Sequence, residues 1–148
     1  MKLIKKHNVI LNLELKGEAG KNEQYWDDIV DIAVKEVHKH GVQDLVFYSS
    51  FEFPMLRRLK KVDPQAKFRV LLWEDTTIWR DIADELQPQA IHLYDQTVTQ
   101  ELVDDIKNEN YELYVYTVND KELGNTLLDM GVDGIFTDSL LGDDALSR

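Results

Sequence analysis

Apolar positions along the chain alternate between two periods. Short runs that are wholly apolar or change face at every residue predict strands, and longer segments with an apolar residue every three or four positions predict helices. Six strands are expected, at residues 9–16, 44–49, 67–72, 90–93, 113–118 and 132–137. Five helices are expected between them: residues 23–40, a short helix opened by Pro54, residues 76–86, a helix capped by Thr97 or Thr99, and residues 121–130.

The spacing of these elements predicts a parallel α/β fold. From the second strand onward a new strand begins roughly every 20 to 23 residues, which suits a compact strand-helix unit. Periodicity leaves open whether the sheet is open and doubly wound or closed as a barrel. A nucleotide-binding open sheet would be favoured by a Gly-x-Gly-x-x-Gly turn after the first strand, but residues 16–20 are Lys-Gly-Glu-Ala-Gly.

The first strand carries the most informative polar pattern. Side chains of a strand alternate between its two faces, so one face is apolar and the other polar: Leu11, Leu13 and Leu15 against Asn12, Glu14 and Lys16. An ordinary strand with one solvated face explains this alternation. In a parallel barrel, however, an acid and a base near the carboxyl end of a strand lie at the mouth where barrel active sites form.

Composition excludes several classes of protein. The chain has 148 residues, 43% of them hydrophobic, which is enough for the core of one domain. A net charge of −11 argues against nucleic acid or an anionic membrane as the main partner. The absence of cysteine excludes a disulfide framework, and the absence of a long apolar run excludes a transmembrane segment. A cytoplasmic location is expected by default.

Four short motifs resemble the glycerophosphodiester phosphodiesterase family. They are Asn-Leu-Glu-Leu-Lys at residues 12–16, Ser-Ser-Phe at 49–51, Tyr-Thr-Val-Asn at 116–119 and Gly-Val-Asp-Gly-Ile-Phe-Thr-Asp at 131–138. They occur in the family's order and at plausible separations. The resemblance implies hydrolysis of a glycerophosphodiester to glycerol 3-phosphate and an alcohol with a divalent metal.

The resemblance also implies roles for particular residues. Glu14 corresponds to a ligand of the metal, and Lys16 to a residue near the substrate phosphate. Ser50 or its neighbour Ser49 can donate a hydrogen bond to the phosphate, although a serine pair at a strand end also suits a helix cap. Tyr116 replaces the family's usual tryptophan and can form an apolar wall for the substrate, or simply pack inside the barrel.

Three other polar residues are expected to be structural. Asn119 and Asp138 are expected to hold loops at the mouth of the barrel rather than to touch substrate. His92 lies on a short strand near that mouth, and a hydrogen-bonded structural histidine is the expectation there.

The resemblance covers nearly the whole chain but only the later part of the family's sequence. Family members begin with a strand ending in His-Arg-Gly, then Glu-Asn-Thr at the head of the first helix, then an acidic strand and a further His-Asp. These segments supply the two histidines proposed as general acid and base and most metal carboxylates, and none is present in the sequence. No catalytic residue is therefore assigned, and binding of Ca²⁺ or Mg²⁺ is expected to be weak or absent.

These observations predict a truncated, partial TIM-type (β/α) barrel that forms a single domain over residues 1–148 and has near-background activity by itself. Six strands leave two sheet edges, at residues 9–16 and 132–137, through which a homo-oligomer can form unless residues 1–6 or the tail after Asp138 cover them. One alternative is a non-catalytic module that binds glycerol phosphate or regulates another protein. Another is an unrelated α/β domain that matches the motifs by chance.

Overall fold

A computed structural model of the chain describes residues 1–138. Its strands are ordered as they occur in the sequence and its described strand pairs are parallel. The strands are β1 (Leu11–Glu14), β2 (Val46–Ser50), β3 (Phe68–Leu72), β4 (Ala90–Tyr94), β5 (Glu112–Tyr116) and β6 (Gly134–Ile135). The α-helices are α1 (Lys2–His7), α2 (Glu23–His40), α3 (Phe53–Val62), α4 (Trp79–Leu86), α5 (Gln100–Asn108) and α6 (Lys121–Asp129). Two short 3₁₀ helices are η1 (Gln43–Leu45) and η2 (Asp95–Thr97).

This order of strands and helices confirms the predicted fold class. Consecutive parallel strands in sequential order, connected by helices, are the arrangement of a TIM-type (β/α) barrel. Contacts divide the chain into two compact units, Met1–Val70 and Leu71–Arg148, with β3 crossing the boundary. The expectation that residues 1–148 form a single domain stays a prediction.

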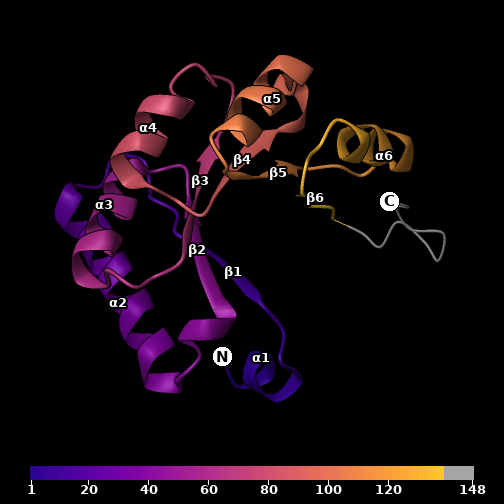
Figure 1. Cartoon of the computed structure of the whole chain (residues 1–148). Helices are drawn as coiled ribbons and strands as arrows, with labels where there is room; N and C mark the ends of the chain where they lie inside the picture. Colours follow the sequence, from indigo (N-terminus) through magenta and orange to yellow (C-terminus); the bar gives the residue numbers. More distant parts are fainter. Residues whose placement is uncertain (139–148) are drawn as a thin grey trace. The chain divides into compact units, whose positions relative to one another are not determined.

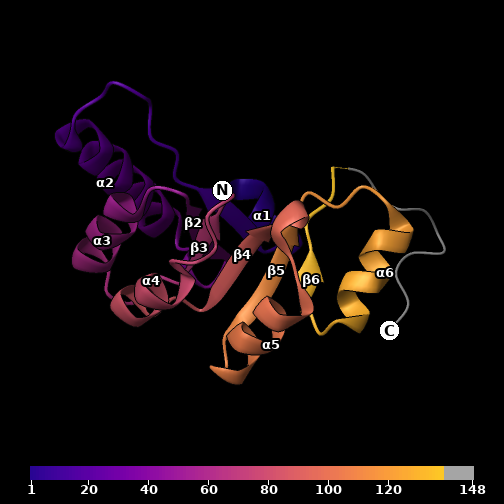
Figure 2. The same ribbon diagram turned by 90° about the horizontal axis from the view of Figure 1, so that it is seen from above.

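The first unit is built on β1, β2 and the first part of β3. Figures 1 and 2 both show α2 and α3 side by side. The side chains buried between these elements are almost all apolar: Leu15, Val30, Val37, Val46, Tyr48, Met55, Leu56, Leu59 and Phe68. The start of α2 is fixed by Asn22, whose side chain accepts a hydrogen bond from the Tyr25 N–H at 3.0 Å. Gly41, at φ 60°, ends α2 in the left-handed conformation.

The second unit holds β4, β5, β6 and helices α4 to α6. In both views α5 lies beside β4 and β5 (Figures 1 and 2). Its core is again apolar: Leu72, Trp79, Ala83, Leu86, Ile91, Leu93, Val103, Ile106, Leu113, Val115 and Leu127. Thr99 caps α5 by accepting from the Leu102 N–H at 3.2 Å, whereas Thr97 donates to the Tyr94 carbonyl. The structure thus decides between the two predicted caps.

The largest differences from the prediction are at α1 and β6, while other elements, among them β1, α4 and β5, differ from their predicted bounds by one to three residues at an end. Helix α1 was not predicted; its six residues include three lysines and none is buried, so it had no apolar stripe to detect. The strand expected at residues 132–137 is only Gly134–Ile135, although backbone bonds of Phe136 to Val115 and Val118 continue beside it. Gly131, shortly after α6, adopts φ 104°, a conformation that suits glycine. The suggestion that the tail after Asp138 covers an edge lies outside the described residues.

Candidate substrate site at the carboxyl ends of the strands

Polar side chains gather where β1 and β2 end, in the first unit. Glu14 is the last residue of β1 and pairs in register with Ser49 of β2. The Ser49 hydroxyl donates to the Asn12 side-chain oxygen at 2.8 Å. Residues in register on parallel strands project to the same side, so Asn12, Glu14 and Ser49 share one face. The polar face predicted for the first strand is therefore present at Asn12 and Glu14, and that Lys16 shares it stays a prediction.

Lys16 lies immediately beyond the last bond of this strand pair. The Leu15 N–H donates to the Ser49 carbonyl at 2.7 Å, which extends the pairing by one residue past β1. Leu15 is buried, with 2% of its surface exposed, whereas Glu14 and Lys16 are both exposed. The buried leucine fixes the backbone between two charged side chains that remain accessible to a ligand.

Ser50 holds this strand end in place. It is fully buried, and its hydroxyl donates to the Leu15 carbonyl at 2.6 Å. The same oxygen accepts the Glu52 N–H at 2.9 Å, just before α3. Ser50 therefore joins the end of β1 to the turn before α3. The helix-cap role considered for this serine pair is wrong for Ser50, because the N-cap of α3 is Glu52 and no side chain caps that helix. The contact of Ser50 with substrate stays a prediction, and that contact would have to replace an existing bond.

Tyr116 belongs to the second unit, at the carboxyl end of β5. Its hydroxyl donates to the Leu72 carbonyl at 2.5 Å, and its ring centroid is 6.3 Å from that of Tyr94. Tyr94 in turn stacks on Trp73 with centroids 4.2 Å apart. Trp73 is 51% exposed. Trp73, Tyr94 and Tyr116 thus form a row of three aromatic rings, at or just after the ends of β3, β4 and β5. That Tyr116 forms a wall for the substrate stays a prediction.

Sequence reasoning missed Trp73 and Tyr94 as members of this row. Both signals were available, because each residue stands at the end of a predicted strand or directly after it. Their stacking could not be deduced, because it depends on the register of strands that are separated in the sequence by α4.

Asn119 and Asp138 join two loops, and His92 is buried among aromatic rings; the expectation that His92 is hydrogen-bonded stays a prediction. The Asn119 amide donates to the Asp138 carboxylate at 2.9 Å, and the Asn119 side-chain oxygen accepts the Asp138 N–H at 2.9 Å. This pair joins the loop after β5 to the loop after β6. His92 is 1% exposed, with its ring 5.3 Å from Tyr114 and 4.8 Å from Phe136. Such burial among aromatic rings suits a residue of the core.

The described residues do not form a binding set for a divalent metal. Within residues 1–138 no cluster of three or more histidine or carboxylate side chains has a geometry that could hold an ion. Glu14 supplies one carboxylate, whereas Ca²⁺ takes about 6 to 8 oxygen ligands and Mg²⁺ about six. The role of Glu14 as a metal ligand stays a prediction.

The order of parallel strands and helices identifies the chain as part of a TIM-type barrel. The polar side chains at the carboxyl ends of its strands are the candidate site. The glycerophosphoryl diester phosphodiesterase family matches residues 2–141 of the sequence, and the chain belongs to that family. The recognition made from the four motifs is confirmed.

Two solved structures illustrate the similarity. A phosphodiesterase from Oleispira antarctica, in complex with the product sn-glycerol-3-phosphate, is 27% identical with a TM-score of 0.84; the match covers 93% of this chain and 54% of that one. A glycerophosphodiester phosphodiesterase from Parabacteroides distasonis is 23% identical with a TM-score of 0.79, over 93% of this chain and 56% of that one. The chain thus spans about half the length of these structures. A comparison with curated protein sequences gave no match.

Proposed function

We propose that the chain is the phosphate-binding, carboxyl-terminal part of a glycerophosphodiester phosphodiesterase barrel, and that it binds glycerol 3-phosphate through Lys16. The observation that supports this most is the Ser50 to Leu15 bond, which holds Glu14 and Lys16 exposed at the end of β1. The Oleispira antarctica protein, whose structure contains glycerol 3-phosphate, supports the choice of ligand. Tyr116 is proposed as an apolar wall, and Glu14 as a ligand on the metal side of the phosphate. The Ser50 hydroxyl proton is used by the Leu15 carbonyl, so Ser50 is proposed to serve the site by positioning Lys16, and a direct bond from Ser50 to the phosphate requires the Leu15 bond to break.

Turnover by this chain alone is proposed to be near background. General acid or base catalysis contributes roughly 10² to 10⁴ in rate and requires a side chain within reach of the reacting proton. The histidines of the first unit lie elsewhere: His7 is in α1, and His38 and His40 end α2, before β2 begins. They are therefore not at the carboxyl ends of β1 and β2.

A titration with glycerol 3-phosphate tests the binding proposal. Replacing Lys16 with Met removes the charge and keeps the length of the side chain, and should weaken binding by about tenfold or more. The matched control is Lys21→Met, since Lys21 is another exposed lysine of the first unit that lies 4.0 Å from Glu18. Equal loss of affinity in the two variants would reject Lys16 as the phosphate ligand.

A second candidate function, a non-catalytic or regulatory module, is favoured by the incomplete metal set around Glu14. Such a module binds glycerol phosphate but does not hydrolyse a phosphodiester. Weak or absent binding of Ca²⁺ and Mg²⁺ is part of both proposals, and calorimetric titration with each ion measures it. Tight binding of either ion would show that the chain supplies further metal ligands besides Glu14.

Self-association through the free edge of β1 is proposed as well. Within the described residues β1 pairs only with β2, and the residues just before it are apolar and exposed, Val9 by 52% and Ile10 by 67%. An apolar edge strand is a template for pairing with another chain. Ile10→Lys should shift the mass measured by light scattering toward the monomer, whereas Ile32→Lys, at a 62% exposed position of α2, should not. A concentration-independent monomer in the unmodified chain would contradict the proposal.

A cytoplasmic location remains part of the proposed function. Across residues 1–138 every helix is too short or too polar to cross a bilayer.

A further inference from the structure

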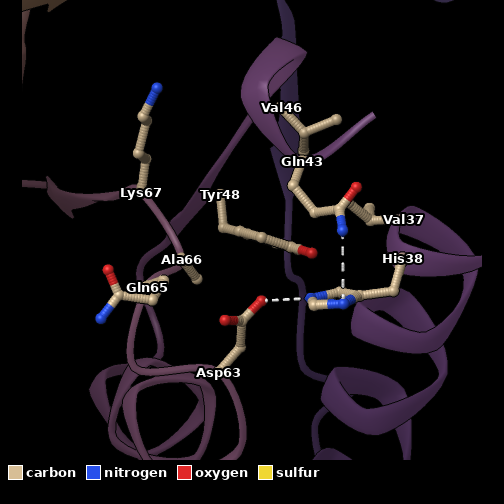
Figure 3. A pocket seen from close by; sticks show the side chains of 9 residues that line it. All are labelled: Val37, His38, Gln43, Val46, Tyr48, Asp63, Gln65, Ala66 and Lys67. Carbon is tan, nitrogen blue, oxygen red and sulfur yellow. Dashed lines mark hydrogen bonds and ion pairs between the residues drawn. The ribbon is translucent and has the colours of Figure 1, made fainter. Parts of the chain in front are cut away.

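A polar pocket lies in the first unit, at the opposite end of β2 from Glu14 and Ser50. Its volume is about 250 Å³, and it is formed where α2 ends, where β2 begins, and in the loop that leads from α3 to β3 (Figure 3). His38, Tyr48 and Asp63 supply its central polar groups. No proposed role in phosphodiester binding uses these residues.

The Tyr48 side chain points into this pocket with an unpaired hydroxyl. Tyr48 is 2% exposed, and its hydroxyl oxygen is buried with no hydrogen-bond partner among the described residues. Figure 3 shows the hydroxyl end of the ring directed toward the space beside His38 and Asp63. Buried polar groups in folded proteins are nearly always paired with protein, water or a ligand, because an unpaired one costs free energy. The pocket therefore contains a hydrogen-bonding group, the Tyr48 hydroxyl, for which the described residues supply no partner.

The neighbouring groups are already oriented. His38 Nε2 and Asp63 Oδ2 are 2.6 Å apart, and Gln43 Nε2 lies 3.4 Å from His38 Nδ1. A neutral imidazole with its proton on Nε2 satisfies both contacts, since it donates to the carboxylate and accepts from the Gln43 amide. Asp63 then keeps its second carboxylate oxygen as an acceptor.

The charges around the pocket favour a ligand with no net charge. Burial, together with the negative charge of Asp63, raises the pKa of Tyr48 to about 12, so the phenol stays protonated and available as a donor at neutral pH. Asp63 repels an anion at this position, and Lys67, which also lines the pocket, disfavours a cation. A hydroxyl group matches both partners because it accepts from Tyr48 and donates to Asp63.

The size and the remaining lining restrict the ligand further. About 250 Å³ exceeds the roughly 30 Å³ that one water occupies in the liquid, yet it is below the about 300 Å³ at which pockets for drug-sized ligands begin. Val37, Val46 and Ala66 contribute apolar surface against which carbon atoms can pack. We propose that this pocket is a binding site for a small neutral polyol, with one hydroxyl accepting from Tyr48 and a neighbouring hydroxyl donating to Asp63.

The test uses glycerol, erythritol and sorbitol as probes on the full chain. Amide chemical shifts are followed by NMR during each titration, and at least one polyol should cause saturable shifts confined to residues 37–48 and 63–67. Tyr48→Phe removes only the hydroxyl and should weaken that binding by about tenfold. Tyr25→Phe is the matched control, because Tyr25 is a tyrosine on α2 whose hydroxyl lies 3.2 Å from Glu18, outside the pocket.

Three outcomes would overturn the proposal. The first is a set of shifts that fail to saturate with every polyol, which would leave water as the only partner of Tyr48. The second is equal polyol affinity in Tyr48→Phe and in the unmodified chain. The third is a clear loss of stability in unliganded Tyr48→Phe, which would show that the hydroxyl already has a partner. Glycerol 3-phosphate binding through Lys16 is measured separately, so neither result decides the other.

Discussion

The two ends of β2 use polar side chains in different ways. At the carboxyl end the buried hydroxyls of Ser49 and Ser50 are both paired, with Asn12 and with the Leu15 carbonyl. Toward the amino end the buried hydroxyl of Tyr48 has no partner among the described residues. The paired serines hold a strand end in position, so the groups free to meet a ligand there are the exposed charges of Glu14 and Lys16. At the amino end the buried group is itself the one available to a ligand.

Among the substitutions that test this comparison, Ser50→Ala should lower the free energy of unfolding most. The substitution leaves the buried Leu15 carbonyl and the part-buried Glu52 N–H without their present partner, which costs about 1–3 kcal/mol. Urea unfolding followed by circular dichroism measures the change in unfolding free energy. An unchanged midpoint would show that the carboxyl end is not held by this serine.

Ser49→Ala is the adjacent comparison and should cost less, about 1 kcal/mol. It removes one hydrogen bond, and the Asn12 amide left behind is only part-buried and can be hydrated. The same urea titration applies. A larger loss here than in Ser50→Ala would reverse the assignment of the anchoring role.

Arg58→Met removes a polar contact away from both ends of β2. It should lower the stability of the fold less than either serine substitution, by an amount that depends on pH. Arg58 on α3 donates to the Asp31 carboxylate of α2 at 2.9 and 2.6 Å, and these hydrogen bonds lower the pKa of Asp31 below its usual 3.8. The Asp31 side chain is 44% exposed, so solvent weakens the pair.

The direction of the pH dependence follows from that lowered pKa. A carboxyl group with a depressed pKa in the folded state stabilises the fold above pH 3.8 and loses that contribution as the pH falls through its folded value. Thermal unfolding should therefore show a lower midpoint for Arg58→Met at pH 7 and a shrinking difference below pH 3.8. A difference that grows on acidification would contradict this origin.

Tyr48→Phe should have the smallest effect on unliganded stability, within about 0.5 kcal/mol, because no hydrogen bond is lost. This near-neutral result, beside the large effect of Ser50→Ala, is the sharpest form of the comparison. Both are hydroxyl deletions at buried positions of one strand. Urea midpoints from the same protein preparations make the comparison direct.

Much of the fold could be predicted because its signals are local. Helix α2 begins and ends where it was predicted, since Asn22 caps its start and Gly41 ends it. The alternation of Leu11 to Glu14 gave the correct polar face at Asn12 and Glu14, because strand period depends only on neighbouring residues. Helix α1 carried no such signal, since three of its six residues are lysines and none is buried.

The arrangement of the sites depended on contacts that no local pattern contains. The hydrogen bond from the Ser50 hydroxyl to the Leu15 carbonyl joins residues that are 35 positions apart in the sequence. The pocket beside Tyr48 combines the end of α2 with the loop after α3, and His38 meets Asp63 across 25 positions. Sequence pattern could name Glu14, Lys16 and Tyr116 through family resemblance, but it could not show which hydroxyls were already used.

The central claim is that this chain binds glycerol phosphate at the end of β1 without completing the phosphodiesterase chemistry. The most direct measurement is release of glycerol 3-phosphate from glycerophosphocholine by the purified chain in the presence of Ca²⁺ or Mg²⁺, with Glu14→Ala in parallel. The account predicts a rate near background for both proteins. Robust turnover that Glu14→Ala abolishes would contradict it.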